Sequence, residues 1–578
     1  MLGCRFVSPL LRDMGIGENL GADNPATEMK IPLQVNARRT STIIHLFLTS
    51  CLLIPSFTHA QSSGYRIAGM VVSKNDGHPL ARTRVTLSDT KNEQKSASVL
   101  TGDDGRFEFT SVPAGKYSLH GAKRGFIGSY YDQHENFWTG IVTGAGLDTE
   151  SLVLKLAPSA TIAGQVLDES GDPSRRARVT LYRVDHSQGS EEIRTIGNTE
   201  TDDLGAYEFS SLNAGTYFVS VSARPWYAVH QPSEVGNSGE PASNFDRTLD
   251  VTYPVVYYAD TPDADSATPI PIRGGERLQV DLHLTPVPGL HLVFRVPGNT
   301  KQGFTFPTLE QPTFDGSAPV ETGPSRMVSP GVVEISGIPA GRYNIRLNGP
   351  TTNLEMNGVD LTRDGEQVDT SSAENLADVK ITAQMSDGSA MPKQSVVVLH
   401  SKSRSNSRGS IVDEKGQADL PQISPGTYAP SAFGGGKQFS IAQISAEGAE
   451  VTGHTLSVQP GASVSLSLKL SSGSTDVDGV VKHSGKPFAG AMVVLVPKDA
   501  EGNRDLFRRD QSDLDGTFSL HDVIPGSYTL TAIENGWDLD WSQPDVIAAY
   551  AKHGQVIQVV GGSNLKVRVP EPIEVQAR

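Results

Sequence analysis

The residues whose types and spacing could do chemistry in this chain are aromatic side chains set among polar ones. Three segments hold all four tryptophans, "GFIGSYYDQHENFWTG", "ARPWYAVHQPSE" and "ENGWDLDWSQPD", and a fourth aromatic segment reads "TYPVVYYADTPDADSATP". Sugar recognition uses this combination, because the apolar face of a sugar stacks on a ring while neighbouring polar groups bind its hydroxyls. The candidate carbohydrate-binding residues are Tyr130, Tyr131, Trp138, Trp226, Tyr227, Tyr257, Tyr258, Trp537 and Trp541.

The same rings have a second interpretation. Aromatic side chains also cover the open end of a β-sandwich or fill the junction with a neighbouring domain, where they bury a large apolar area. The sequence leaves ligand binding and packing open as alternatives.

The patterns that catalysis requires are missing from the sequence. There is no H-E-x-x-H zinc motif and no G-x-S-x-G nucleophile elbow, and the histidines are scattered, many beside turns. The acidic turns "GDDG", "TDDLG" and "DLDG" each offer two aspartates, whereas a calcium site needs about six to eight oxygens. We therefore predict no catalytic residues, no metal site and no cofactor.

The charge balance narrows the choice of partner. The chain has 65 acidic against 49 basic residues, a formal net charge of −16. That sign disfavours nucleic acid and anionic membrane surfaces as partners. The aromatic loops favour a polysaccharide or an envelope protein instead.

The N-terminus has the pattern of an export signal. Basic residues precede an apolar stretch from Ile43 to Ile54, and small residues end at Ala60. This stretch is too short to span a bilayer, and nothing downstream resembles a membrane helix. We expect cleavage after Ala60, no transmembrane segment in the mature chain, and a periplasmic, outer-membrane-associated or extracellular location.

A rival interpretation of the signal places a lipid on Cys51. The residues "LTSC" resemble a lipoprotein cleavage site, although "LLIPSF" continues the apolar run beyond the cysteine. Cleavage after Ala60 would leave no cysteine in the mature chain, so its domains would fold without disulfides.

The elements that must position the aromatic loops are marked by a repeated motif. The segments "VPAGKYSL", "LNAGTYFV", "IPAGRYNI", "ISPGTYAP" and "IPGSYTL" have their tyrosines at 117, 217, 343, 428 and 528. Spacings near 100 residues suit small domains rather than a solenoid. We interpret the glycine as taking a positive φ at a tight reversal, and the tyrosine as a corner that ties its hydroxyl to nearby backbone.

The segments around each motif predict strands. Modules open with a strand, a Gly-containing turn and a second strand, as in "TIAGQVLDESGDPSRRARVTL", which is typical of a hairpin. An acidic turn and an alternating strand lead to the tyrosine, and a closing strand such as "VSLSLKLS" follows. With 58 Gly, 36 Pro and few amphipathic stretches, the composition indicates an all-β chain.

We therefore predict a tandem array of about five small antiparallel β-sandwich modules, prealbumin- or immunoglobulin-like, after the signal segment. The predicted limits are signal region 1–60, module 1 at 61–158, module 2 at 159–287, a degenerate module 3 at 288–374, module 4 at 375–472 and module 5 at 473–578.

The combined pattern "AGxV…DxxGxPxxxxxVxL…TDDxGxFxFxxVPAGxYxL" resembles the carboxypeptidase regulatory-like domain, a transthyretin-like sandwich related to collagen-adhesin B-type repeats and to carbohydrate-binding-like folds. The match is good in modules 1, 2 and 5, partial in module 4 and weak in module 3. The resemblance implies non-catalytic modules with a binding or scaffold role at the cell envelope. The alternative it implies is an accessory component of an envelope carboxypeptidase or transporter that acts with a separate partner.

Overall fold

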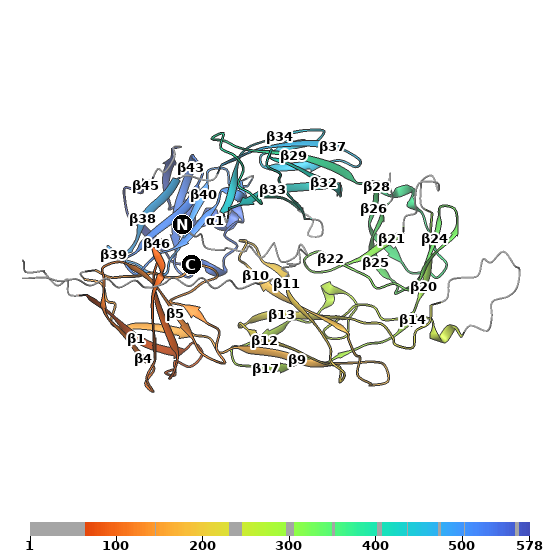
Figure 1. Ribbon diagram of the computed structural model, residues 1–578, viewed down its shortest axis with the longest axis horizontal. Helices are drawn as coiled ribbons and strands as arrows, with labels where there is room; N and C mark the ends of the chain where they lie inside the picture. Colours follow the sequence, from red (N-terminus) through yellow and green to blue (C-terminus); the bar gives the residue numbers. More distant parts are fainter. Residues whose placement is uncertain are drawn as a thin grey trace, which may run out of the picture. The chain divides into compact units, whose positions relative to one another are not determined.

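The computed structural model describes residues 64–578 except 145, 231–245, 296–305, 349–352, 402–406, 436, 472–474, 502 and 561–565. The predicted signal region, and with it Cys51, lies outside the described residues. The described residues belong to one compact unit, Gly64–Arg578, and consist mainly of strands and turns (Figure 1). The predicted all-β fold is confirmed, and α1 (Pro544–Ala551) is the single α-helix in this part of the chain.

Five main hydrophobic cores follow one another along the chain. Their buried residues come from 67–156, 160–284, 290–368, 377–470 and 477–575. Each core draws on residues inside one predicted module, and the exact module limits stay a prediction. Below, modules 1 to 5 keep the ranges given above.

Modules 1 and 2 each place their strands in two main sheets. The elements of module 1 are β1 (Tyr65–Ser73), β2 (Arg84–Asp89), β3 (Asn92–Leu100), β4 (Arg106–Val112), β5 (Lys116–Ala122), β6 (Ser129–Tyr130), β7 (Ile141–Val142) and β8 (Leu152–Leu156). Those of module 2 are β9 (Ala160–Leu167), β10 (Arg178–Asp185), β11 (Glu192–Glu200), β12 (Ala206–Leu212), β13 (Gly215–Ser222), η2 (Arg247–Leu249), β14 (Val251–Thr252), β15 (Val256–Tyr257), η3 (Ala264–Ser266), β16 (Ile270–Ile272), β17 (Arg277–Gln279) and β18 (Leu282–His283).

Module 3, the degenerate unit, still forms two sheets. After β19 (Val287–Pro288), which pairs with β14, its elements are β20 (Leu290–Arg295), β21 (Pro307–Pro312), β22 (Ser317–Pro319), β23 (Ser325–Ser329), β24 (Val332–Ile338), β25 (Gly341–Asn348), β26 (Asn353–Leu361), β27 (Gln367–Val368), η4 (Thr370–Ser372) and β28 (Glu374–Asn375).

In modules 4 and 5 a bridging strand, β34 or β46, joins the two layers. Module 4 has β29 (Ala377–Met385), β30 (Val396–Ser401), β31 (Arg408–Ile411), β32 (Gln417–Ile423), β33 (Gly426–Gly434), β34 (Lys437–Glu447), β35 (Glu450–Thr452), β36 (Thr455–Val458) and β37 (Ser463–Ser471). Module 5 has β38 (Thr475–His483), β39 (Lys486–Pro487), β40 (Met492–Pro497), η5 (Arg504–Leu506), β41 (Arg508–Gln511), β42 (Thr517–Val523), β43 (Gly526–Ile533), η6 (Gly536–Asp538), α1, β44 (Gln555–Val559), β45 (Lys566–Arg568) and β46. The last strand, β46, spans Ile573–Gln576.

The first strand of every module has the same two neighbours. In module 1, β1 lies between β4, which runs antiparallel to it, and β8, which runs parallel. The same arrangement recurs around β9, β20, β29 and β38. Each mostly antiparallel sandwich therefore contains one parallel pair, formed by its opening and closing strands, which brings the two ends of a module together.

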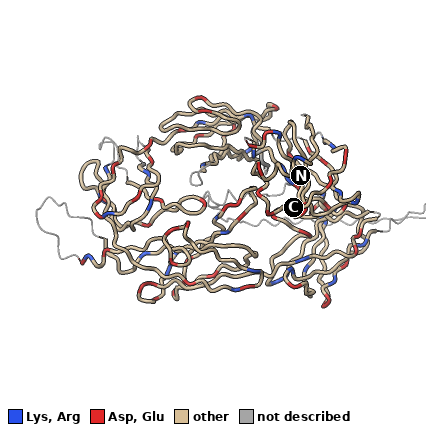
Figure 2. Tube along the Cα trace, turned by 180° about the vertical axis from the view of Figure 1, so that it is seen from behind, with Lys and Arg blue, Asp and Glu red and all other residues tan. Residues whose placement is uncertain are grey.

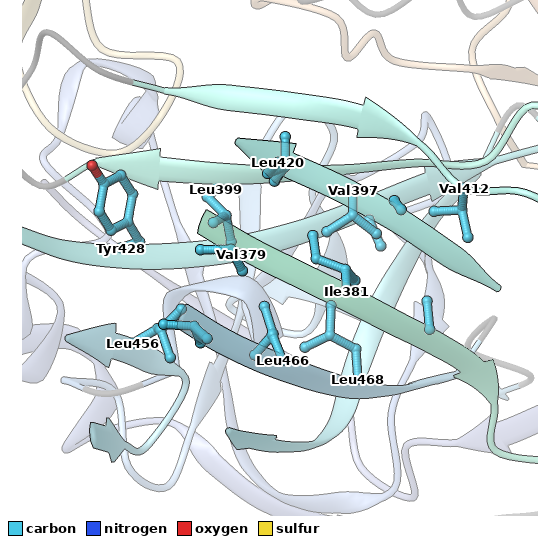
Figure 3. Packing of buried hydrophobic residues seen from close by; sticks show 14 of the residues in the cluster. Val379, Ile381, Val397, Leu399, Val412, Leu420, Tyr428, Leu456, Leu466 and Leu468 are labelled. Carbon is cyan, nitrogen blue, oxygen red and sulfur yellow. The ribbon is translucent and has the colours of Figure 1, made fainter. Parts of the chain in front are cut away.

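The alternating strands place one apolar row inside the sandwich. In module 4, Val379 and Ile381 of β29 face Leu466 and Leu468 of β37 and the opposite layer (Figure 3). Each of these four side chains is 1 % exposed. Period-2 alternation is thus sufficient to assign the inner face of these strands.

The predicted opening hairpin is wrong. The first and second strands lie in different sheets, since β1 pairs with β4 and β8 whereas β2 pairs with β3 and β5. Only single bridges, Val72 to Pro79 in module 1 and Leu167 to Pro173 in module 2, connect the two arms. The pairing continues for one residue past each proline, since the Leu80 amide donates to the Val71 carbonyl and the Ser174 amide to the Val166 carbonyl, both at 2.9 Å. Beyond that point the chain crosses to the other layer.

The tyrosine of the repeated motif is a corner in all five modules, as predicted. Each ring is buried, and each hydroxyl donates to the carbonyl oxygen four residues earlier. The oxygen-to-oxygen distances are 3.0 Å for Tyr117 to Pro113, 2.7 Å for Tyr217 to Asn213, 2.6 Å for Tyr343 to Pro339, 2.6 Å for Tyr428 to Ser424 and 2.9 Å for Tyr528 to Ile524.

The predicted role of the motif glycine is wrong. Positive φ occurs six residues before each tyrosine, at Ser111 (57°), Ser211 (60°), Gly337 (68°), Gln422 (60°) and Asp522 (54°), whereas only Gly426 (152°) among the motif glycines has one. The ladder slips its register there, so a bulge makes the bend. The motif glycine makes room for the ring instead, because a Cβ on Gly341 would lie 3.1 Å from the Tyr343 hydroxyl.

Replacing Tyr343 with phenylalanine tests the corner. The buried Pro339 carbonyl would lose its 2.6 Å donor, and we expect the free energy of unfolding to fall by about 1 kcal/mol. Chemical denaturation measures the change. Tyr130→Phe is the control, because the Tyr130 hydroxyl has no hydrogen bond to the described residues, and equal midpoints for both variants would contradict the corner.

Candidate functional site

The most exposed predicted site residue is Trp226, on the loop after β13. Its side chain is 87 % exposed, and it meets Tyr227 edge to face with ring centroids 5.8 Å apart. The Tyr227 hydroxyl donates to Glu169 of the β9–β10 turn, and Tyr253 donates to the same carboxylate at 2.6 Å. Burial and Glu169 raise the pKa of Tyr227 to about 12, so its hydroxyl stays a donor and the loop stays tethered.

A second aromatic surface lies on the loop after β5 in module 1. Tyr130 and Trp138 stack with centroids 4.6 Å apart and an interplanar angle of 22°, and both are partly buried. Gln133 holds this loop by accepting from the Tyr130 amide at 2.9 Å and donating to the Glu135 carbonyl at 2.8 Å. Tyr131 faces the other way and packs against the core of module 1.

Tyr257 and Tyr258 do not join these surfaces. Tyr257 is 1 % exposed in a cluster with Tyr182 and Phe218 of module 2 and Phe314 of module 3, and its ring centroid lies 5.4 Å from that of Phe314. Tyr258 packs against the core of module 2. Their side chains serve packing within module 2 and between modules 2 and 3.

Trp537 and Trp541 are also buried, at 6 % and 9 % exposed. They cover the outer face of β40, whose sequence "MVVLVP" is apolar on both faces. His134 of module 1 stacks on Trp537 at 5.1 Å and 5°, and Phe137 lies 5.4 Å from the same ring. The structure thus places four of the nine candidates on two accessible surfaces and the other five in packing clusters or against module cores, and carbohydrate binding stays a prediction.

Arg509 lies at the centre of the contact among modules 1, 2 and 5, and it was not among the residues predicted from the sequence. Its guanidinium is 4.2 Å from the centroid of the Trp541 ring, forms an ion pair with Glu135 at 2.7 Å and donates to the Ser187 carbonyl at 3.1 Å. The side chain of Arg509 is 8 % exposed and that of Glu135 20 %. The adjacent basic pair in "LFRRDQS" is the sequence signal that could have marked this position.

A buried carboxylate extends the same contact. Asp513, in the acidic turn of module 5, pairs with Lys116 and accepts from the Gly140 amide of module 1 at 2.8 Å. Burial raises the pKa of Asp513 although Lys116 opposes the shift, and burial raises the pKa of nearby Asp510 to about 6. For an acid whose pKa is raised on folding, ionisation opposes folding, so we expect module 5, which contains Asp510, to be more stable near pH 5 than at pH 8.

The carboxylates of the acidic turns accept hydrogen bonds from backbone amides. Asp202 accepts from the amides of Leu204 and Ala206, both at 2.9 Å, and Asp413 accepts from the amides of Lys415 and Gln417 at 2.8 and 2.7 Å. In modules 2 and 4 these bonds fix the turn before the strand that leads to the tyrosine corner. Among the described residues, no group of three or more His, Cys, Asp or Glu side chains could hold a metal ion.

The fold defines a class, a multi-module β-sandwich protein, and its modules 1 and 2 carry accessible aromatic loops. Residues 66–135 and 161–250 match the family model of the carboxypeptidase regulatory-like domain. The resemblance expected from the sequence is therefore confirmed for modules 1 and 2. No curated protein matches the chain significantly in sequence.

Several solved structures match the chain at low similarity. The minor pilin GBS52 of Streptococcus agalactiae is 14 % identical, covers 41 % of this chain and 100 % of its own, and has a TM-score of 0.20. The Bacillus anthracis TIE protein is 10 % identical over 88 % of this chain and 73 % of its own, with a TM-score of 0.16. The shaft pilin SpaA of Lactobacillus rhamnosus GG is 9 % identical over 39 % and 98 %, with a TM-score of 0.17. Values this low carry no argument about function.

Proposed function

We propose that this is an exported, non-catalytic binding protein of the cell envelope, in which the aromatic loops of modules 1 and 2 bind saccharides. The observation that carries the proposal is Trp226, whose indole is 87 % exposed on a tethered loop. An indole left in water contributes nothing to folding through burial. Holding it in place before a ligand arrives lowers the entropy cost of binding.

The surroundings of both surfaces suit sugar chemistry. Beside the Tyr130–Trp138 stack lie the exposed side chains of Asp132 and Asn136, which can bind sugar hydroxyls while the rings take the apolar face. No helix among the described residues is long and apolar enough to cross a bilayer. Acidic and basic residues are interspersed along the trace of the described chain (Figure 2), which leaves these loops as its distinctive surfaces.

Substituting Trp226 tests the proposal. With the mature chain and a panel of neutral and acidic oligosaccharides, we expect at least one ligand to shift tryptophan fluorescence. Trp226→Ala should weaken that ligand about tenfold, which corresponds to ~1.4 kcal/mol. Isothermal titration calorimetry gives the affinities.

Two controls separate binding from stability. Leu204→Ala removes another exposed apolar side chain of module 2, 67 % exposed, and should leave binding unchanged. Trp138→Ala reports the surface on module 1. If no saccharide binds, or if Trp226→Ala and Trp138→Ala both bind like the unaltered chain, the proposal fails and the accessory role beside an envelope carboxypeptidase or transporter replaces it.

A further inference from the structure

Four arginines gather around one depression at the end of module 2. The depression has a volume of ≈ 230 Å³. Its charged lining consists of Arg175, Arg176, Arg178, Arg224, Glu200 and Glu321. Four cations against two carboxylates leave a local excess of positive charge in a chain whose formal net charge is −16.

Two of the four guanidiniums have no partner among the described residues. Arg175 pairs with Asp203 at 2.6 Å, and Arg224 pairs with Glu321 at 2.5 Å. The side chains of Arg176 and Arg178, in contrast, make no ion pair or hydrogen bond within the described chain. These two guanidiniums keep their planar donor forks available, and such a fork matches a carboxylate bidentately.

The backbone that carries the unpaired arginines is fixed. Arg176 has a φ of +55°, and its amide donates to the Thr201 carbonyl at 3.1 Å. The Thr201 hydroxyl accepts from the Ala177 amide at 2.9 Å and donates to the Ser174 carbonyl at 2.6 Å. The loop is therefore held on both sides of Arg176, which fixes the backbone that carries this side chain without a ligand.

The depression and the exposed indole of the proposed saccharide surface are carried by the same loop after β13. Trp226 follows Arg224 by two residues, so their Cα atoms lie within about 7 Å of each other. The hydrogen bond from Tyr227 to Glu169 ties this loop to the β9–β10 turn, which continues into Arg175 and Arg176. A stacking ring and two free guanidiniums thus sit at one end of one module.

We infer that this end of module 2 binds an acidic saccharide of the uronate type, with the sugar ring on Trp226 and its carboxylate on Arg176 and Arg178. The inference rests on the proposed function and names its ligand class. A uronate carries one carboxylate per ring. Only a single negative charge per sugar ring therefore enters a pocket that also contains the carboxylates of Glu200 and Glu321. Nucleic acid, with one charge per about 1.7 Å, is repelled by the acidic remainder of the chain.

The test compares charged and neutral forms of one saccharide. Oligogalacturonate and its fully methyl-esterified form are titrated into the mature chain by calorimetry. We expect the acid to bind tenfold or more tightly than the ester, and the double variant R176Q/R178Q to lose that preference. Binding of the acid should also weaken as salt is raised.

Module 1 offers a matched control. Arg82 has the same left-handed backbone, with a φ of +54°, and Arg84 occupies the position of Arg178 at the start of the second strand. The double variant R82Q/R84Q removes the same charge from the chain and should bind oligogalacturonate within twofold of the unaltered protein. Equal losses in both double variants would show a general charge effect and overturn the inference.

The remaining outcomes are distinct. If acid and ester bind equally, or if inorganic phosphate displaces oligogalacturonate at similar concentration, the uronate site is refuted while saccharide binding through Trp226 stands. If neither saccharide binds and the wider panel is also negative, the proposed function fails together with the inference.

Discussion

Replacing Arg509 with alanine is expected to lower the free energy of unfolding by about 3–5 kcal/mol, the usual cost of removing one partner of a buried ion pair. The change would leave the Glu135 carboxylate, 20 % exposed, without its cation and the Ser187 carbonyl without a donor. It would also remove the cation from the face of Trp541, a contact worth about 0.5–2 kcal/mol. The stabilising interactions would be lost at the contact among modules 1, 2 and 5.

Tryptophan fluorescence during chemical denaturation measures this effect, because two of the four tryptophans lie in the contact. We expect R509A to unfold at lower denaturant and its emission to shift to the red before global unfolding. Arg106→Ala is the control, since Arg106 is 73 % exposed and pairs with an exposed Asp104, and such pairs contribute about 0–1 kcal/mol. A midpoint for R509A no lower than that of R106A would show that the contact adds nothing to stability.

Local sequence patterns were sufficient to predict most of the fold. Alternation over two residues fixed the inner faces of strands such as β29 and β37, and the Gly-x-Tyr motif marked a real corner in all five modules. These features depend on residues within a few positions of each other, so a single sequence contains them. The opening hairpin is wrong because the chain does reverse after the first strand, but the second strand then pairs in the opposite sheet, and that crossing is a tertiary choice which the local pattern does not contain.

The division of the aromatic candidates could not be predicted. Trp226 and Trp541 have similar polar neighbours in sequence, yet one is 87 % and the other 9 % exposed. Trp541 is buried against residues far along the chain, such as Gly189, where a Cβ would lie 2.7 Å from the indole. Contacts between residues so far apart produce no periodic pattern in a single sequence. The strand β40 is apolar on both faces, however, and this indicates that another part of the chain must cover its outer face.

The arginine depression could not be predicted either, because the residues that line it are far apart in the sequence. Arg175, Arg176 and Arg178 are visible together in "SRRARV", but Arg224 reaches them only because β13 pairs with β10 and places Ser222 opposite Arg178. A cluster of three arginines on an exposed loop suggests solubility when read alone. The fourth arginine and the neighbouring indole change that interpretation.

Replacing Gly164 with alanine should destabilise module 2 by about 3 kcal/mol, at the upper end of the usual cost of overpacking. Gly164 lies in β9, between β12 and the closing strand, and a Cβ there would sit 1.8 Å from the Val280 carbonyl oxygen. That oxygen accepts from the Tyr207 hydroxyl at 2.6 Å, and the Val280 amide donates to Ala163 at 2.8 Å. The clash is with backbone, so β9 and the closing segment must separate and both bonds weaken.

Gly197→Ala is the matched control, because Gly197 lies in β11 of the same module and a Cβ at that position would meet nothing within 4 Å. Alanine should stabilise that strand slightly, by about 0.5 kcal/mol, through the lower entropy of the unfolded chain. Hydrogen exchange of peptides from β9 and β17 in the full chain reports the stability of module 2 directly. Similar protection in G164A and G197A would mean that the opening and closing strands do not approach as closely as the parallel pair requires, and the repeated glycine of "IAG" would then have no structural role in the module.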